Sequence, residues 1–171
     1  GSVKGGVAMK EVRVETITPQ KFAPFGKYLG KPGDIPPSSE REDLRVWLEI
    51  SDMLGLNSSK AMWGYLEVNR HDLPLDRLER HCRTAEAFIA LRGSSVMVVA
   101  PTSDLSDPKA VPDEGAMRAF LLEGGEGVFL PRGVWHWAPF AISEKASFLL
   151  LLQNDIDIDI REIEPCTIRL Y

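Results

Sequence analysis

Turn-forming residues interrupt the chain every few positions, so its apolar runs are too short for ordinary globular helices. The runs are rich in β-branched and aromatic residues, which favours strands. They include VRVETI (residues 12–17), RVWLEI (45–50), MWGYLEVN (62–69), AEAFIAL (85–91), SVMVVAP (95–101), MRAFLL (117–122), GVFLP (127–131) and SFLLLLQ (147–153). Only residues 19–26, where Phe22 and Phe25 are spaced to pack together, and residues 73–78 indicate short helical segments. The pattern predicts an all-β domain, a sandwich or a closed barrel, with a few short helices.

Two segments complete the predicted organisation. Residues 30–43 are dense in Gly, Pro, Ser and charge, which predicts an exposed loop. Residues 154–165 (NDIDIDIREIEP) alternate, with one slip near Glu162, and predict an antiparallel edge strand. The buried positions are expected to be Ile156, Ile158, Ile160 and Ile163, and the solvated ones Asp155, Asp157 and Asp159. The acidic run is therefore interpreted as a solvated face rather than a calcium site.

Composition limits the classes of function. The 171 residues, 44% of them hydrophobic, suit one domain, assigned to residues 9–171, and residues 1–8 are interpreted as an expression scar and linker. A formal net charge of −5 gives no electrostatic footprint for nucleic acid or an anionic membrane. The longest strongly apolar run, residues 148–152, is far shorter than the about 20 residues that span a bilayer. Cys82 and Cys166 form no CxxC pair, so we expect a reduced, cytoplasmic protein.

The stretch LERHCRTAEAFIALRG (78–93) places two carboxylates around an imidazole. On a strand, Glu79 and His81 share one face, while Arg80 and Cys82 take the other. Glu86 follows after a break and can return on the paired strand. Such a set suits a divalent ion such as Mn, Ni, Fe(II) or Zn. Arg80 is then expected at the surface or an interface, and Cys82 is not expected to be a nucleophile.

A second stretch, GGEGVFLPRGVWHWAPF (124–140), supplies a further imidazole. Pro131 and Gly133 set a turn, because proline fixes φ and glycine tolerates positive φ. His136 follows three residues later between Trp135 and Trp137, where it is well placed to point into a cavity. Both histidines also have a simpler interpretation as ordinary surface or core residues.

The spacing of the two stretches resembles the two sequence motifs of the cupin family. The positions in register are Gly93, Gly125, Pro131, Gly133 and His136, with Glu79 where the first motif usually has histidine. Cupins are small antiparallel barrels, so the resemblance implies a cupin-type double-stranded β-helix, or jelly-roll barrel. It also implies a metal site formed by Glu79, His81, Glu86 and His136.

Longer segments are similar to the ureidoglycolate lyase family, also named ureidoglycolate hydrolase. These segments are ITPQKFAPFGKYL (17–29), LPLDRLERHCRTAEAFIAL (73–91) and MRAFLLEGGEGVFLPRGVWHWAPFA (117–141). The family splits ureidoglycolate into glyoxylate and urea in purine and allantoin catabolism. This chain departs from the family at Glu86, usually glutamine, at Trp137, usually a second histidine, and at Pro131, often histidine.

The resemblance implies roles for the candidate residues. A divalent metal would lower the pKa of the substrate hydroxyl, and Glu86 or Glu79 would act as the base. Arg132 or Arg118 would hold the substrate carboxylate, and Trp135 and Trp137 would be pocket walls. A homodimer is a family-level expectation, for which the predicted edge strand 156–163 could serve.

Two other functions remain open. The chain could be a cupin that binds a small metabolite, or has a structural role, without turnover, which the departures at Glu86 and Trp137 favour. It could also be another metal-dependent cupin enzyme, such as an isomerase or a dioxygenase.

Overall fold

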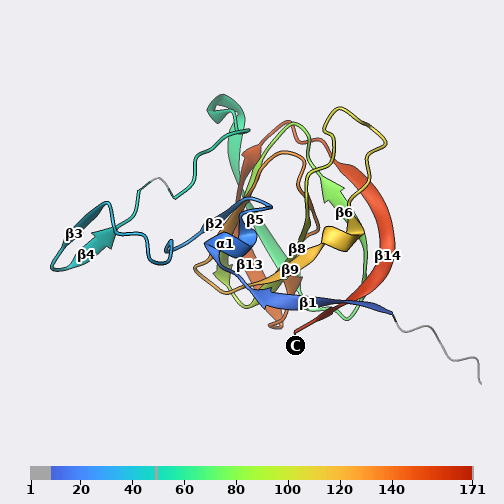
Figure 1. Ribbon diagram of the computed structural model, residues 1–171, viewed down its shortest axis with the longest axis horizontal. Coiled ribbons are helices and arrows are strands. Elements are labelled where there is room, and N and C mark those ends of the chain that lie inside the picture. Colours follow the sequence, from blue (N-terminus) through green and yellow to red (C-terminus); the bar gives the residue numbers. More distant parts are fainter. Residues whose placement is uncertain (1–8, 49, 171) are drawn as a thin grey trace, which may run out of the picture.

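Strands dominate the computed structural model, which describes residues 9–48 and 50–170 (Figure 1). The interpretation of residues 1–8 as a scar and linker lies outside the described residues. The larger sheet has the order β11 (Trp135–His136), β6 (Leu75–Arg80), β14 (Asp159–Arg169), β1 (Lys10–Thr16), β9 (Arg118–Leu122), β8 (Ser95–Ala100) and β12 (Phe140–Ala141). The smaller sheet has the order β2 (Lys27–Leu29), β10 (Gly127–Leu130), β7 (Glu86–Arg92), β13 (Lys145–Gln153) and β5 (Ala61–Asn69).

The remaining elements are short. Strands β3 (Ser39–Arg41) and β4 (Leu44–Val46) form a hairpin that projects from the barrel on the left of Figure 1. The helical elements are α1 (Pro19–Phe22) and two 3-10 turns, η1 (Ser58–Lys60) and η2 (Glu114–Ala116). The all-β jelly-roll barrel with a few short helices, predicted from the sequence, is confirmed. No helix among the described residues is long and apolar enough to cross a membrane.

Apolar side chains fill both sides of the larger sheet. Strand β8 is buried at every position, because alternate residues enter two different cores. Met97 and Val99 face the core between the two sheets, where Phe88 and Phe148 of the smaller sheet meet them. Val96 and Val98 face a second core with Trp135. The larger sheet curls around this second core, since β11 pairs with both β6 and β8.

The short helix α1 closes one end of the first core. Thr18 caps it, its hydroxyl accepting a hydrogen bond from the Lys21 N–H at 3.1 Å. The rings of Phe22 and Phe25 lie 5.9 Å apart and pack on Phe120 at 5.3 and 5.8 Å. The predicted helical segment with its Phe22–Phe25 contact is therefore confirmed.

Local predictions failed at three places. Residues 73–78 are not helical, because this segment leads into β6 and pairs with β14 and β11. The strand predicted for residues 45–50 ends at Val46. The loop predicted for residues 30–43 contains β3, which pairs with β4 rather than with the barrel.

The interpretation of the acidic tail was wrong. Strand β14 lies between β6 and β1 and so has no free edge for dimer formation. Ile156, Ile158 and Ile160 are exposed by 36, 63 and 46%, and only Ile163 is buried as predicted. Alternation alone places these isoleucines inside and the aspartates in solvent. It fails because residues far away in sequence form hydrogen bonds with the carboxylates of Asp157 and Asp159.

One of those partners is Arg80, which was predicted at the surface or an interface but is only 1% exposed. Its Nε donates to Asp159 at 3.0 Å, and its Nη1 and Nη2 donate to the carbonyls of Asp104 and Asp107. Its guanidinium also lies 4.9 Å from the centre of the Trp135 ring. The buried guanidinium is tolerated here because each of its three nitrogens donates a hydrogen bond.

Candidate metal centre

Three strands and the segment after β6 bring the four predicted ligand residues together. His136 in β11 lies directly opposite Glu79 in β6, so their side chains emerge side by side on one face. His81 follows β6, and Glu86 begins β7. The two stretches are tied by a hydrogen bond from the Gly133 N–H to the His81 carbonyl at 2.8 Å.

Glycine is required at that junction. Gly133 has φ +86, a conformation that other residues adopt at a cost. A Cβ there would lie 2.3 Å from Leu105 Cδ2. The turn that delivers His136 thus depends on the glycine predicted from the sequence.

The four polar groups converge at short range. Glu86 Oε1 lies 3.3 Å from His81 Nε2 and 3.4 Å from His136 Nε2, and Glu79 Oε1 lies 3.7 Å from His136 Nε2. Ligand atoms of Glu79, His81 and His136 all lie within 4.8 Å of one another. Ligands bound at 2.0–2.1 Å in a tetrahedron are separated by about 3.3–3.4 Å, which is the spacing observed between Glu86 and the two imidazoles.

Backbone carbonyls orient both imidazoles. His81 Nδ1 lies 2.7 Å from the Asp157 carbonyl, and His136 Nδ1 lies 2.9 Å from the Val134 carbonyl. A carbonyl oxygen only accepts hydrogen bonds, so each Nδ1 must carry the proton. Each Nε2 is thereby turned toward the carboxylates, as metal-binding histidines are held by their outer hydrogen bonds.

Asp157 has a role that sequence reasoning missed. Its carboxylate accepts hydrogen bonds from the N–H groups of Cys82 and Arg83 at 2.9 and 2.8 Å, in addition to the contact of its carbonyl with His81. The residue therefore holds both the His81 ring and the backbone that directly follows it. The alternating run predicted a solvated side chain, and only knowledge of the β6–β14 pairing could have revealed the contact.

The ionisable groups shift one another strongly. Burial lowers the pKa of His81, but the adjacent Glu86 carboxylate outweighs this effect and raises the pKa to about 9. Burial raises the pKa of Glu86, yet contacts with His136 and His81 prevail and lower it to about 2. At neutral pH the site without metal thus holds an ionised carboxylate and a protonated His81.

A cation suits this arrangement. His136 Nε2 is buried and has no hydrogen-bond partner within the described residues. A buried polar atom without a partner is costly, so a further group is expected beside it. Two imidazoles and two carboxylates match the ligand preferences of Mn, Fe(II), Ni and Zn.

The other predicted site residues lie elsewhere or at the margin. Trp135 is fully buried in the second core, where its Nε1 donates to Ser103 Oγ, and Trp137 packs at the edge of that core. Arg118 donates through Nε and Nη2 to Glu15 and through Nη1 to the Lys21 carbonyl. Three of the four predicted substrate contacts therefore have partners outside the cluster.

Arg132 is the exception. It follows Pro131, which lines a narrow hollow together with Thr84 and three of the ligand residues. Its side chain is exposed and extends past Gly55, where a Cβ would lie 3.2 Å from Arg132 Cγ. Arg132 is thus the predicted cation that lies at the rim of the cluster.

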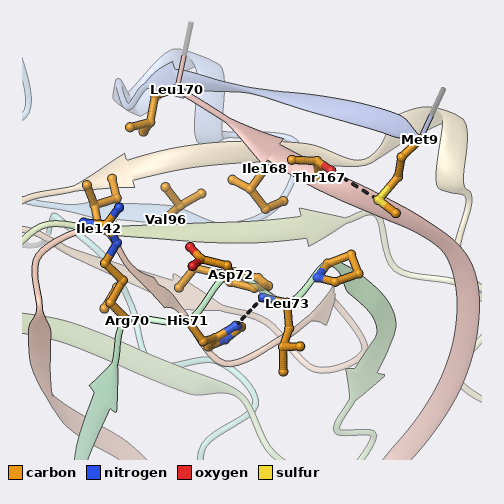
Figure 2. Close-up of a pocket in the computed structure, with 13 residues that line it drawn as sticks. Met9, Arg70, His71, Asp72, Leu73, Val96, Ile142, Thr167, Ile168 and Leu170 are labelled. Carbon is orange, nitrogen blue, oxygen red and sulfur yellow. Dashed lines mark hydrogen bonds between the residues drawn. The ribbon is translucent and has the colours of Figure 1, made fainter.

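A larger pocket of about 450 Å³ lies at another place, at the open end of the second core (Figure 2). Figure 2 shows Arg70 and Asp72 on one side of it and Ile168 and Leu170 on another. None of the four ligand residues lines it. We assign the chemistry to the smaller hollow, because ligand groups converge there and the larger pocket has an apolar floor around Val96.

Comparisons with known proteins agree with the sequence resemblance. A family model described as ureidoglycolate lyase matches residues 9–168. Relatives named ureidoglycolate lyase from Pseudomonas fluorescens (strain Pf0-1) and Pseudomonas aeruginosa (strain UCBPP-PA14) are each 31% identical over 147 residues. The match covers 84% of this chain, and 84 and 83% of the two relatives. This chain belongs to the ureidoglycolate lyase family.

Solved structures are more distant. An oxalate decarboxylase from Bacillus subtilis with Mn(II) centres aligns with a TM-score of 0.40 at 17% identity, covering 61% of this chain and 24% of that one. An oxalate oxidase aligns with a TM-score of 0.43 at 17% identity, covering 60 and 47%. The sequence relatives, rather than these solved structures, show that the chain is an enzyme of the ureidoglycolate lyase family.

Proposed function

We propose that the protein is a metal-dependent lyase that cleaves the C–N bond of ureidoglycolate, or a similar small hydroxy acid, to release glyoxylate and urea. The observation that supports this most strongly is the convergence of Glu79, His81, Glu86 and His136. The buried His136 Nε2 has no hydrogen-bond partner among residues 9–48 and 50–170. Membership of the ureidoglycolate lyase family supplies the substrate class.

The two carboxylates differ in ways that suggest different roles. Glu86 is buried, and its lowered pKa keeps it ionised, which suits a ligand rather than a base. The side chain of Glu79 is 21% exposed, so it is the carboxylate that substrate can reach. We assign His81, His136 and Glu86 to the metal and Glu79 to proton transfer.

A divalent ion in this site supplies Lewis acidity toward the substrate hydroxyl and carboxylate. Glu79 accepts the hydroxyl proton, and the oxygen electrons form the carbonyl of glyoxylate. The electron pair of the C–N bond leaves with the urea nitrogen, which receives the proton back from Glu79. Arg132 holds the substrate carboxylate by a charge-assisted hydrogen bond. Hydroxyl proton, C–N bond and amide proton are thus accounted for without a further reactant.

The experiment measures glyoxylate and urea released from ureidoglycolate by metal-loaded protein, against a blank without protein because the substrate decomposes unaided. The proposal predicts equimolar products above the blank, lost on chelation and in His136→Ala. Glu79→Gln should retain metal and lose turnover, whereas Glu86→Gln should lose metal. Release of ammonia instead of urea would point to an amidohydrolase.

The same assay distinguishes the lyase from a cupin that binds a metabolite, or has a structural role, without turnover. A protein that holds stoichiometric metal but releases no product above the blank would keep the site and lose the substrate assignment. A protein with neither metal nor product would favour the metabolite-binding or structural cupin. A homodimer and a reduced, cytoplasmic setting also remain proposals; Cys82 and Cys166 are both free thiols.

A further inference from the structure

The second core is filled at one end of β8 and open at the other. Strand pairing sets Trp135 opposite Ala100, so the fully buried indole fills the core at that end of the strand. Val96 lies near the other end of β8, where it lines the pocket of about 450 Å³ shown in Figure 2. Small-molecule sites have volumes of about 300–1,000 Å³. The open end of the second core is therefore large enough for a small ligand.

Apolar side chains surround this pocket. Phe140, Ile142 and Ile168 line it and are only partly buried. At its margin, Leu73 and Leu170 are 72 and 45% exposed. Single exposed apolar residues are normal, but several around one hollow mark a binding site. The pocket thus offers a continuous apolar surface to a ligand.

Arg70 and Asp72 add one positive and one negative charge to the same wall. Both belong to the segment between β5 and β6, and Figure 2 shows both side chains directed toward the pocket. Among residues 9–48 and 50–170, the one side-chain hydrogen bond of this segment is that of His71, and neither Arg70 nor Asp72 forms an ion pair. Both charges are therefore available to a ligand.

Three contacts hold the backbone of this segment in place. The Arg70 N–H donates to the Glu144 carbonyl at 2.9 Å. The Leu73 N–H donates to His71 Nδ1 at 3.2 Å, and the His71 ring lies 5.2 Å from the Phe140 ring. A site whose backbone is already fixed loses less conformational entropy when a ligand binds. The backbone that carries the two charges is thus pre-organised for binding.

We propose that this pocket binds an α-amino acid with a large apolar side chain, such as leucine or phenylalanine. The ligand carboxylate pairs with Arg70 and the ligand ammonium group pairs with Asp72, both through charge-assisted hydrogen bonds. The apolar side chain of the ligand packs on Val96 and Ile168. None of the four ligand residues of the metal centre lines this pocket, so the inference does not depend on the proposed reaction.

The two opposite charges distinguish this ligand from simpler ones. An apolar acid without an amine would pair with Arg70 but would bring a second negative charge beside Asp72. An apolar amine would pair with Asp72 but would bring a second positive charge beside Arg70. Like charges brought together select against both of these ligands. A zwitterion with an apolar side chain satisfies both charges and the apolar surface.

An NMR titration of amide signals tests the proposal, because it gives both the Kd and the location of the ligand. Leucine and phenylalanine should shift the signals of residues 70–73, 96 and 168 with a Kd of about 1 mM or tighter. Leucine amide lacks the carboxylate, and N-acetyl-leucine lacks the ammonium group. Each should bind about tenfold more weakly than leucine, since each loses one hydrogen bond between charged groups. Alanine, which lacks the large apolar side chain, should also bind more weakly.

Two variants assign the charges. Arg70→Gln should weaken leucine binding about tenfold and remove the preference for leucine over leucine amide. Asp72→Asn should instead remove the preference for leucine over N-acetyl-leucine. Arg92→Gln is the matched control, because Arg92 is an exposed arginine on β7 that does not line the pocket, and its Kd for leucine should be that of the wild type. His136→Ala should also bind leucine with an unchanged Kd, which makes the result independent of the metal centre.

Three results would overturn the proposal. The first is the absence of shifts in these signals with either amino acid at about 20 mM. The second is a set of shifts at His81 and Glu86 instead, which would place the ligand at the metal centre. The third is equal affinity of the wild type for leucine and N-acetyl-leucine, because an apolar acid would then suffice.

Discussion

Metal affinity should depend steeply on pH, because a metal ion at His81 must displace a proton. The Glu86 carboxylate raises the pKa of His81 to about 9, so the residue is protonated in the site without metal throughout the neutral range. The apparent Kd for the metal should then fall about tenfold for each unit by which the pH rises, or about 100-fold from pH 6 to pH 8. An imidazole with the ordinary pKa of about 6.5 would give only about a fourfold change over the same range.

Competition with a colorimetric chelator measures this slope, and calorimetry in two buffers of different ionisation enthalpy counts the protons released. Glu86→Gln is the matched variant, because it removes the charge that raises the pKa of His81, and its slope should be much shallower. If that variant binds metal too weakly, an NMR titration of wild-type protein without metal should give a His81 midpoint near pH 9. A fourfold change in wild type, or a midpoint near 6.5, would refute the electrostatic reasoning.

Three further perturbations test other parts of the structure. Without metal, the raised pKa of His81 contributes at most about 3 kcal/mol to the free energy of unfolding. This contribution is fully present below pH 6.5 and should disappear as the pH rises through 9, which urea unfolding at several pH values measures. Arg80→Met removes the ion pair with Asp159 and two hydrogen bonds to carbonyls, and should lower the free energy of unfolding by about 3 kcal/mol; a loss below about 1 kcal/mol would contradict the buried network. Asp157→Ala removes the carboxylate that holds the backbone N–H groups of Cys82 and Arg83, directly after His81, and should weaken metal binding about 10- to 100-fold in the chelator assay. Unchanged affinity would contradict its positioning role.

The sequence predicted those features that depend on neighbouring residues or on fixed spacing. Alternation placed Glu79 and His81 on one face, and the structure brings both to the same cluster. The turn at Gly133 was predicted from glycine and proline chemistry, and its positive φ agrees. The Phe22–Phe25 contact required only the spacing within one helical turn.

Features that depend on distant partners were not predictable in this way. Arg80 was expected at the surface or an interface because it lies on the opposite face of the strand from Glu79 and His81, but its partner Asp159 is 79 positions away. The isoleucines of the tail were assigned to a core by alternation, whereas Ile160 is exposed in β14, which pairs with a strand on each side. Trp135 was expected near substrate because it adjoins His136, yet adjacent residues on a strand face opposite sides, and Trp135 enters the second core.

The most direct test of the central claim is the metal content of wild-type protein and His136→Ala, measured by elemental analysis after both have been loaded and desalted identically. The account predicts about one equivalent of divalent ion per wild-type chain and a small fraction of that in the variant, with both proteins folded. No retained metal in the wild type, or equal metal in both proteins, would contradict the metal centre.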